Sequence, residues 1–161
     1  MQNSSELQIT ESQKNELINQ LVSFALTDTL LFLPPNIPAT KALKAINGYL
    51  STEYIPCRDF NIPHQNTQQS AKLEKYLHTL KRQDVAFIYQ IGKDLHSVLL
   101  SILLAEHLLE KQQAFELAFY EELLQQETWG KTEEIIKKHQ TILQHLEYLD
   151  KQYGKRSISQ N

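Results

Sequence analysis

The sequence predicts an all-α protein folded as an antiparallel helical bundle. From residue 70 to residue 150 apolar side chains recur every three or four positions, the spacing of one face of a helix. Only four glycines and five prolines occur among 161 residues, so the residues that punctuate sheets and tight turns are scarce. Short connections between long helical patterns favour antiparallel neighbours. Residues 10–153 are interpreted as one domain between a disordered leader, 1–9, and a flexible tail, 154–161.

The first predicted helix begins after Thr10 and ends near Asp28. Thr10 and Gln13 have the T-x-x-Q spacing of a capping box, in which each side chain accepts a hydrogen bond from the other residue's backbone N–H. Leu17, Ile18 and Leu21 then supply an apolar face at helical spacing.

Prolines dominate the next part of the chain. Pro34, Pro35 and Pro38 exclude a continuous helix, and a shorter helix is expected over residues 39–50. Residues 51–66 contain two further prolines and predict irregular chain, with at most a short strand around residues 54–60.

Four helices are predicted after residue 70, over residues 71–81, 84–109 and 112–129 and from Thr132 to about Asp150. The second of these would be a single rod about 39 Å long at the rise of an α-helix. Gly130 suits the left-handed position that ends the third, and Thr132 can cap the start of the fourth.

Composition excludes several classes of function. The net charge of −3 offers no broad attraction to nucleic acid or anionic lipid. Cys57 is the only cysteine, so intrachain disulfides and Cys-x-x-Cys metal sites are excluded. The acidic N-terminus does not read as a signal peptide, and the most apolar run, 98–109, is too short and too polar to cross a bilayer.

Signatures of catalysis are missing as well. The chain contains no Gly-rich phosphate loop, no H-E-x-x-H and no G-x-S-x-G. Its six histidines are scattered, and the spacing of His139 and His145 puts them on different faces of a helix. We therefore expect no enzymatic activity, no metal or cofactor, and no small-molecule substrate.

One strip of the third helix stands out because it mixes polar and apolar groups. At 100° per residue a single quadrant holds Ala114, Phe115, Ala118, Glu122, Gln125 and Trp129. An unpaired buried charge is costly, so Glu122 indicates either an ion pair inside the protein or a surface that meets another molecule. A solvated helix edge explains the strip equally simply. An acid/base pair of Glu121 and Glu122 is disfavoured, because adjacent helix positions point about 100° apart and no nucleophile accompanies them.

The pattern Glu122-x-x-Gln125-x-x-x-Trp129-Gly130, followed by two glutamates, resembles the signature of the ATP synthase alpha-subunit assembly chaperones. This is the family of the mitochondrial ATPase assembly factor 2 and its alphaproteobacterial relatives. Segments 27–30, 80–87 and 97–100 are also similar to the family. The resemblance covers roughly residues 21–134 and is tightest over 95–134.

The resemblance implies a helical domain that binds the newly made alpha subunit of the catalytic head and shields its assembly surface until the beta subunit takes over. It implies no ATPase activity. Because family importance attaches to the motif's glutamate, the expected partner-binding residues are Glu122, Gln125, Ala118, Ala114, Asp28 and Ser97. Phe115, Trp129 and Gly130 are expected to be structural, with Trp129 packed against Phe115. The expected location is the bacterial cytoplasm, or the mitochondrial matrix for a processed eukaryotic chain.

Two departures from the family keep an alternative open. Leu33 stands where the family tends to have arginine. Family members usually carry an N-terminal, mostly β domain, for which this chain has no room. The alternative is a divergent helical interaction module that has lost this client.

Overall fold

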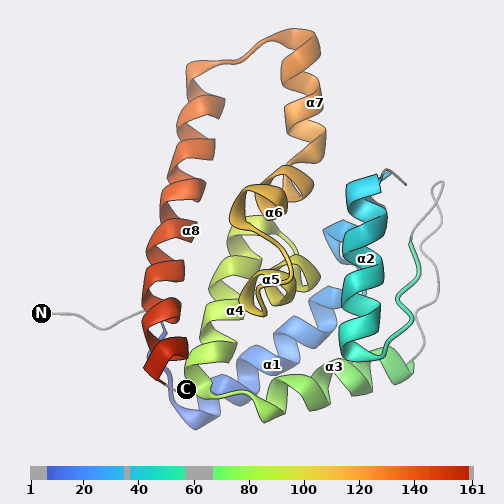
Figure 1. Cartoon of the computed structure of the whole chain (residues 1–161), viewed down its shortest axis with the longest axis vertical. Coiled ribbons are helices and arrows are strands. Elements are labelled where there is room, and N and C mark those ends of the chain that lie inside the picture. The colour runs from blue at the N-terminus through green and yellow to red at the C-terminus, as the bar shows by residue number, and fades with distance from the viewer. Residues whose placement is uncertain (1–6, 35–36, 57–66, 160–161) are drawn as a thin grey trace, which may run out of the picture.

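A computed structural model describes residues 7–34, 37–56 and 67–159. Within these ranges the regular elements are eight α-helices and one 3-10 turn, without a strand, which confirms the predicted all-α class. Figure 1 shows α4 and α5 at the centre, with α1 and α3 across one end, α2 along one side and α8 along the opposite side. None of the described helices is long and apolar enough to cross a membrane.

Helix α1 (Glu11–Ala25) starts at the predicted capping box. The Gln13 amide donates to Thr10 Oγ1 at 3.1 Å, and the Thr10 amide donates to Gln13 Oε1 at 2.8 Å. The helix ends before Asp28, which instead caps the 3-10 turn η1 (Thr29–Phe32) by accepting a hydrogen bond from Leu30 N.

Helix α2 (Ile37–Leu50) and helix α3 (Thr67–Thr79) follow. Between them, the described residues 51–56 form no strand. The Asn47 side chain holds this segment against α2, because its Oδ1 accepts from Tyr54 N at 2.8 Å and its Nδ2 donates to Tyr54 O at 3.2 Å. The strand predicted around residues 54–60 is therefore wrong for 54–56, and residues 57–60 lie outside the described residues.

The predicted rod over residues 84–109 is two helices, α4 (Arg82–Leu95) and α5 (Val98–Ala105). His96 adopts a left-handed conformation with φ 55°, and Ser97 is extended with φ −154°. The apolar periodicity gives no sign of this break because all eight residues of α5 are buried. An element that is apolar on every side shows no change of phase where it begins.

The third predicted long helix is also divided, into α6 (Lys111–Ala118) and α7 (Tyr120–Trp129). Phe119 leaves the helical region with φ −111° and ψ 27°, and its buried ring turns into the core. Helix α8 (Glu133–Ser159) begins at the predicted cap, where Ile135 N donates to Thr132 Oγ1 at 3.2 Å. It continues past residue 153 into the stretch predicted as a flexible tail.

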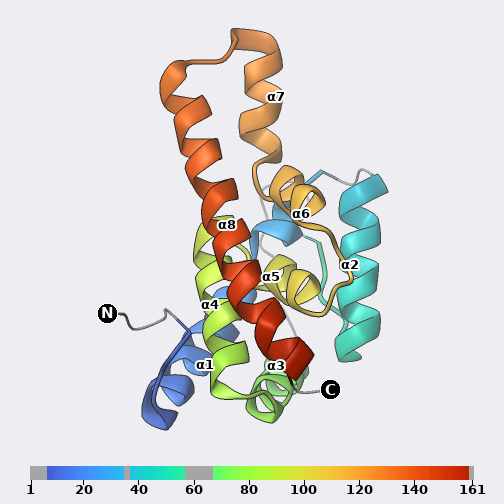
Figure 2. The same cartoon turned by 60° about the vertical axis from the view of Figure 1, so that its left-hand side comes forward.

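Helices α4 and α8 run antiparallel and side by side, as both views show (Figures 1 and 2). Phe87 on α4 stacks on Tyr153 of α8 with ring centroids 4.1 Å apart, and Asp94 bonds to His145. Beyond this contact, α7 and the first part of α8 project past the rest of the molecule. Residues 120–139 are called the arm below.

Candidate functional site

The arm carries exposed apolar side chains close to its tip. Trp129 is 84% exposed, Leu124 is 48% exposed and Ile136 is 39% exposed. Gly130, at φ 86°, ends α7 directly after the tryptophan. The arm therefore offers another molecule a ready apolar surface.

The expected packing of Trp129 on Phe115 is wrong. Phe115 is only 3% exposed, and its ring contacts those of Phe119 and His139, with centroids 5.0 and 5.1 Å away. The break at Phe119 separates the helix that carries Phe115 from the helix that carries Trp129. Because of that break, helical spacing no longer places the two aromatic side chains on one face.

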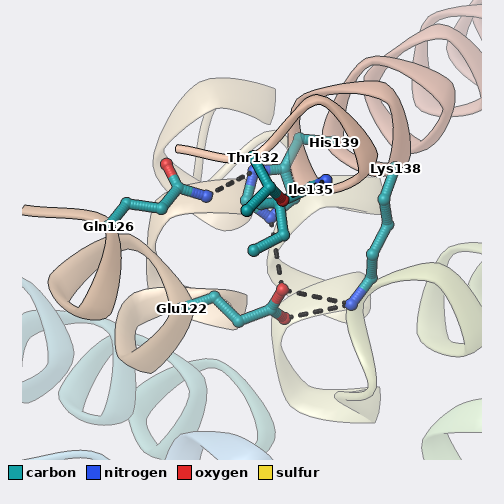
Figure 3. A network of polar contacts seen from close by, with 6 residues as sticks. All are labelled: Glu122, Gln126, Thr132, Ile135, Lys138 and His139. Atoms are coloured by element: carbon teal, nitrogen blue, oxygen red, sulfur yellow. Dashed lines mark hydrogen bonds and ion pairs between the residues drawn. The ribbon is translucent and has the colours of Figure 1, made fainter. Parts of the chain in front are cut away.

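Glu122 belongs to α7, and its carboxylate contacts side chains of α8 (Figure 3). Lys138 Nζ lies 3.1 Å from Glu122 Oε1 and 3.2 Å from Oε2, and His139 Nε2 lies 3.4 Å from Oε1. The Glu122 side chain remains 33% exposed. Of the two possibilities left open by the sequence, internal pairing is present, yet the carboxylate still reaches solvent.

His139 forms the buried side of this cluster and is 8% exposed. Gln126 Nε2 lies 3.5 Å from its Nδ1, while the rings of Phe115 and Phe119 flank it. Among the described residues its Nε2 has no hydrogen-bond partner, and it lies 3.4 Å from Glu122 Oε1. Because the imidazole is packed against these two rings, it covers one side of the Glu122 carboxylate.

The remaining residues of the predicted strip separate in the structure. Gln125 is exposed on α7, Ala118 is half-buried at the end of α6, and Ala114 is fully buried in the core. The shallow track of alanines expected beside Glu122 is therefore not a continuous surface, because Ala114 is buried on α6 and the break at Phe119 puts Glu122 on a separate helix. Glu122, Gln125 and Trp129 remain together on α7.

Asp28 and Ser97 come together, but in the interior. Ser97 Oγ donates to Asp28 Oδ1, while the amides of Val98 and Leu99 donate to Asp28 Oδ2 at 2.7 and 3.0 Å. Burial raises the pKa of the Asp28 carboxyl, against the opposing effect of these hydrogen bonds. Both residues are 3% exposed, so their predicted contact with a partner is wrong for this structure. They cap α5, whose N-terminus favours a negative charge.

Lys138, His139 and Gln126 belong to the Glu122 cluster but were not predicted. Lys138 follows Glu122 by 16 residues and lies on another helix. The only hint in the sequence was the need of Glu122 for a partner, and helical spacing could not say which lysine would supply it.

Two of the concavities among the described residues lie mostly outside the arm, although Tyr120 at its base lines the second. One of about 460 Å³ between α1 and α4 is lined by Phe24, Lys93 and His96, among others. Another of about 530 Å³ between α2 and α6 is lined by Lys41, Leu108 and others. Among the described residues, no three His, Cys, Asp or Glu side chains gather as metal ligands would.

No family model and no curated protein sequence matches this chain. Solved structures do match. The Atu1473 protein of Agrobacterium tumefaciens, a candidate chaperone, is 18% identical with a TM-score of 0.77, over 89% of this chain and 57% of its own. Atp12 from Paracoccus denitrificans is 16% identical with a TM-score of 0.76, over 93% of this chain and 68% of its own. The D202K mutant of that Atp12 matches at a TM-score of 0.74 and 17% identity, with the same coverage.

The chain thus spans between 57% and 68% of the length of these proteins. At this level of identity the likeness concerns the arrangement of the helices. The similarity extends over 89–93% of this chain. The helical fold of this protein is the fold found in Atp12.

Proposed function

We propose that this protein is an assembly chaperone that binds the newly made alpha subunit of the ATP synthase catalytic head. The observation that carries the proposal is the match to Atp12 over 93% of the chain, together with the motif of Glu122, Gln125 and Trp129 on the projecting arm. The match supplies the fold, and the motif supplies the likeness to the alpha-subunit chaperones.

The arm has the chemistry that a transient protein contact needs. Trp129 and Leu124 provide exposed apolar area, and tryptophan is among the residues that dominate binding energy in interfaces. Gln125 and the half-exposed Glu122 add polar groups that can fix the orientation of a client. The client-binding surface is therefore proposed to be α7, and the body holds the arm in place.

Catalysis has little support from the same residues. The Glu122 carboxylate is paired with Lys138, and Glu121 is exposed on the first turn of α7. A general acid or base needs a partner group aimed at a substrate, and neither glutamate has that arrangement.

The proposal is tested by co-expressing the chain with tagged ATP synthase alpha subunit from the same organism. The measurement is how much of the chain is retained with the tagged subunit. Wild type is expected to be retained, and Trp129→Ala is expected to lose most of the retention. Phe24→Ala is the matched control, because Phe24 is an exposed aromatic residue on α1, 57% exposed, and outside the arm.

Retention of wild type and both variants alike would place the contact elsewhere on the molecule. A wild-type chain that retains no alpha subunit, but captures a different protein through Trp129, would favour the alternative of a divergent interaction module.

A further inference from the structure

Lys138 places an ammonium group symmetrically against the Glu122 carboxylate, in contact with both oxygens at 3.1 and 3.2 Å. We propose that the client presents a basic side chain, lysine or arginine, to Glu122, and that Lys138 is an intramolecular stand-in which the client displaces. This inference rests on the proposed function, since it concerns which group of the client the same arm binds.

The geometry of the carboxylate favours a cation over a neutral donor. A single ammonium that spans both oxygens makes two charge-assisted hydrogen bonds. The guanidinium of an arginine matches the same pair of oxygens with two parallel N–H groups. The contact with Lys138 thus shows which kind of group this face of Glu122 accepts.

The pair can be displaced at low cost because it lies at the surface. The Lys138 side chain is 50% exposed and the Glu122 side chain is 33% exposed. Ion pairs with this degree of exposure contribute little to stability. Lys138 Nζ also lies 5.6 Å from the centre of the Phe119 ring, and this contact does not require Glu122.

His139 limits the direction from which a client can approach. Its imidazole is buried between Phe115 and Phe119, and its Nε2 lies 3.4 Å from Glu122 Oε1. That side of the carboxylate is closed, so a client approaches from the solvent-facing side, where Lys138 lies. A cation that arrives there competes with the ammonium group of Lys138 for the same two oxygens.

The charge of α7 points to the same kind of client. Among its ten residues α7 carries three glutamates and no lysine or arginine. Glu121 and Glu127 are exposed, and Glu122 pairs with Lys138 of α8. Complementary charge sets the orientation and partner choice of an interface, so an apolar client patch bordered by basic side chains fits this helix.

The test is the affinity of purified alpha subunit for four forms of the full chain, measured by biolayer interferometry at one fixed salt concentration. Lys138→Met removes the stand-in but keeps the length of the stem, so binding should become about two- to fivefold tighter. Glu122→Gln removes the charge that both cations seek, so binding should weaken by about tenfold or more. Lys137→Met is the control, because Lys137 is the exposed neighbour on α8 and the variant makes the same change of charge. It should bind as wild type does.

Weaker or unchanged binding by Lys138→Met, while wild type binds, would overturn the stand-in and leave the chaperone proposal standing. If wild type itself binds no alpha subunit, the proposed function fails and the inference fails with it. Amide hydrogen exchange of α7 in the client-free protein provides a separate readout. Exchange in Lys138→Met should match exchange in Lys137→Met, because an ion pair this exposed contributes little to stability. Faster exchange in Lys138→Met alone would show that the pair stabilises the arm and would contradict displacement at low cost.

Discussion

The hydroxyl of Ser97 donates a hydrogen bond to the carboxylate of Asp28, although the two residues are 69 positions apart in the chain. The same carboxylate accepts the amides of Val98 and Leu99, so a residue that follows α1 satisfies the free N–H groups at the start of α5. Helix α5 is wholly buried. Its N-terminus has to be completed by the protein itself, since a buried amide without a partner is costly.

Replacing Asp28 by asparagine is expected to lower the free energy of unfolding by about 3 kcal/mol. Both oxygens of the Asp28 carboxylate accept hydrogen bonds, whereas asparagine has one oxygen and an NH₂ group. The NH₂ group would therefore face backbone or hydroxyl donors that have lost their acceptor. Urea unfolding followed by circular dichroism measures the change. Glu127→Gln makes the same carboxylate-to-amide change at an exposed residue of α7. Its free energy of unfolding should stay within about 0.5 kcal/mol of that of wild type.

The stability conferred by Asp28 should depend on pH in a defined direction. Burial raises its pKa above the ordinary value of 3.8, so the folded protein binds this proton more tightly than the unfolded chain does. The contribution is complete below pH 3.8 and is lost as pH rises through the raised value. Measured at several pH values between about 4 and 7.5, the gap between wild type and Asp28→Asn should widen toward low pH. A gap that narrows toward low pH would contradict the raised pKa.

Two glycines should respond in opposite ways to alanine. Gly130 has φ 86°, a conformation that strains any residue with a Cβ, so Gly130→Ala should destabilise the protein by about 1 kcal/mol or more. Gly48 lies within α2, and a Cβ there would meet nothing within 4 Å. Gly48→Ala should therefore stabilise the protein by up to about 1 kcal/mol. Thermal unfolding of the two variants side by side provides the comparison, and a shift of the same sign in both would refute it.

Trp129 is the only tryptophan, so its fluorescence reports on the tip of the arm alone. At 84% exposure it should show the red-shifted emission of an indole in water, and Trp129→Ala should change the free energy of unfolding by less than about 0.5 kcal/mol. Addition of alpha subunit that has had its own tryptophans replaced should shift the emission to the blue. A blue-shifted spectrum in the free protein would mean that the indole is packed, against the structure.

Most of the helices could be predicted from local pattern, but the breaks at residues 96–97 and at Phe119 could not. A left-handed residue such as His96 costs about 1–2 kcal/mol, and nothing near it in the sequence signals that cost. The compensating contacts come from Asp28, far away in the chain. The capping box of Thr10 and Gln13 was predictable because both of its partners lie within one turn.

In the candidate site, too, features within one helix could be predicted and contacts between helices could not. Helical spacing within α7 correctly indicated that Glu122 needs a partner or a client. It could not identify Lys138 and His139, because they reach Glu122 only through the packing of α7 against α8. The prediction for Trp129 was wrong for a related reason, since the break at Phe119, ten residues upstream, decides whether its ring meets the core.

Because the arm projects from the body, the two parts of this protein are under different packing constraints during evolution. Substitutions in the body must preserve the volumes that fill the core around α5. Substitutions at the tip, where Leu124 and Trp129 face solvent, have no such volume to preserve. A lineage could therefore alter the partner that the arm recognises while the body keeps its shape, and residues 130–132 between the two arm helices could accept an insertion without repacking the interior.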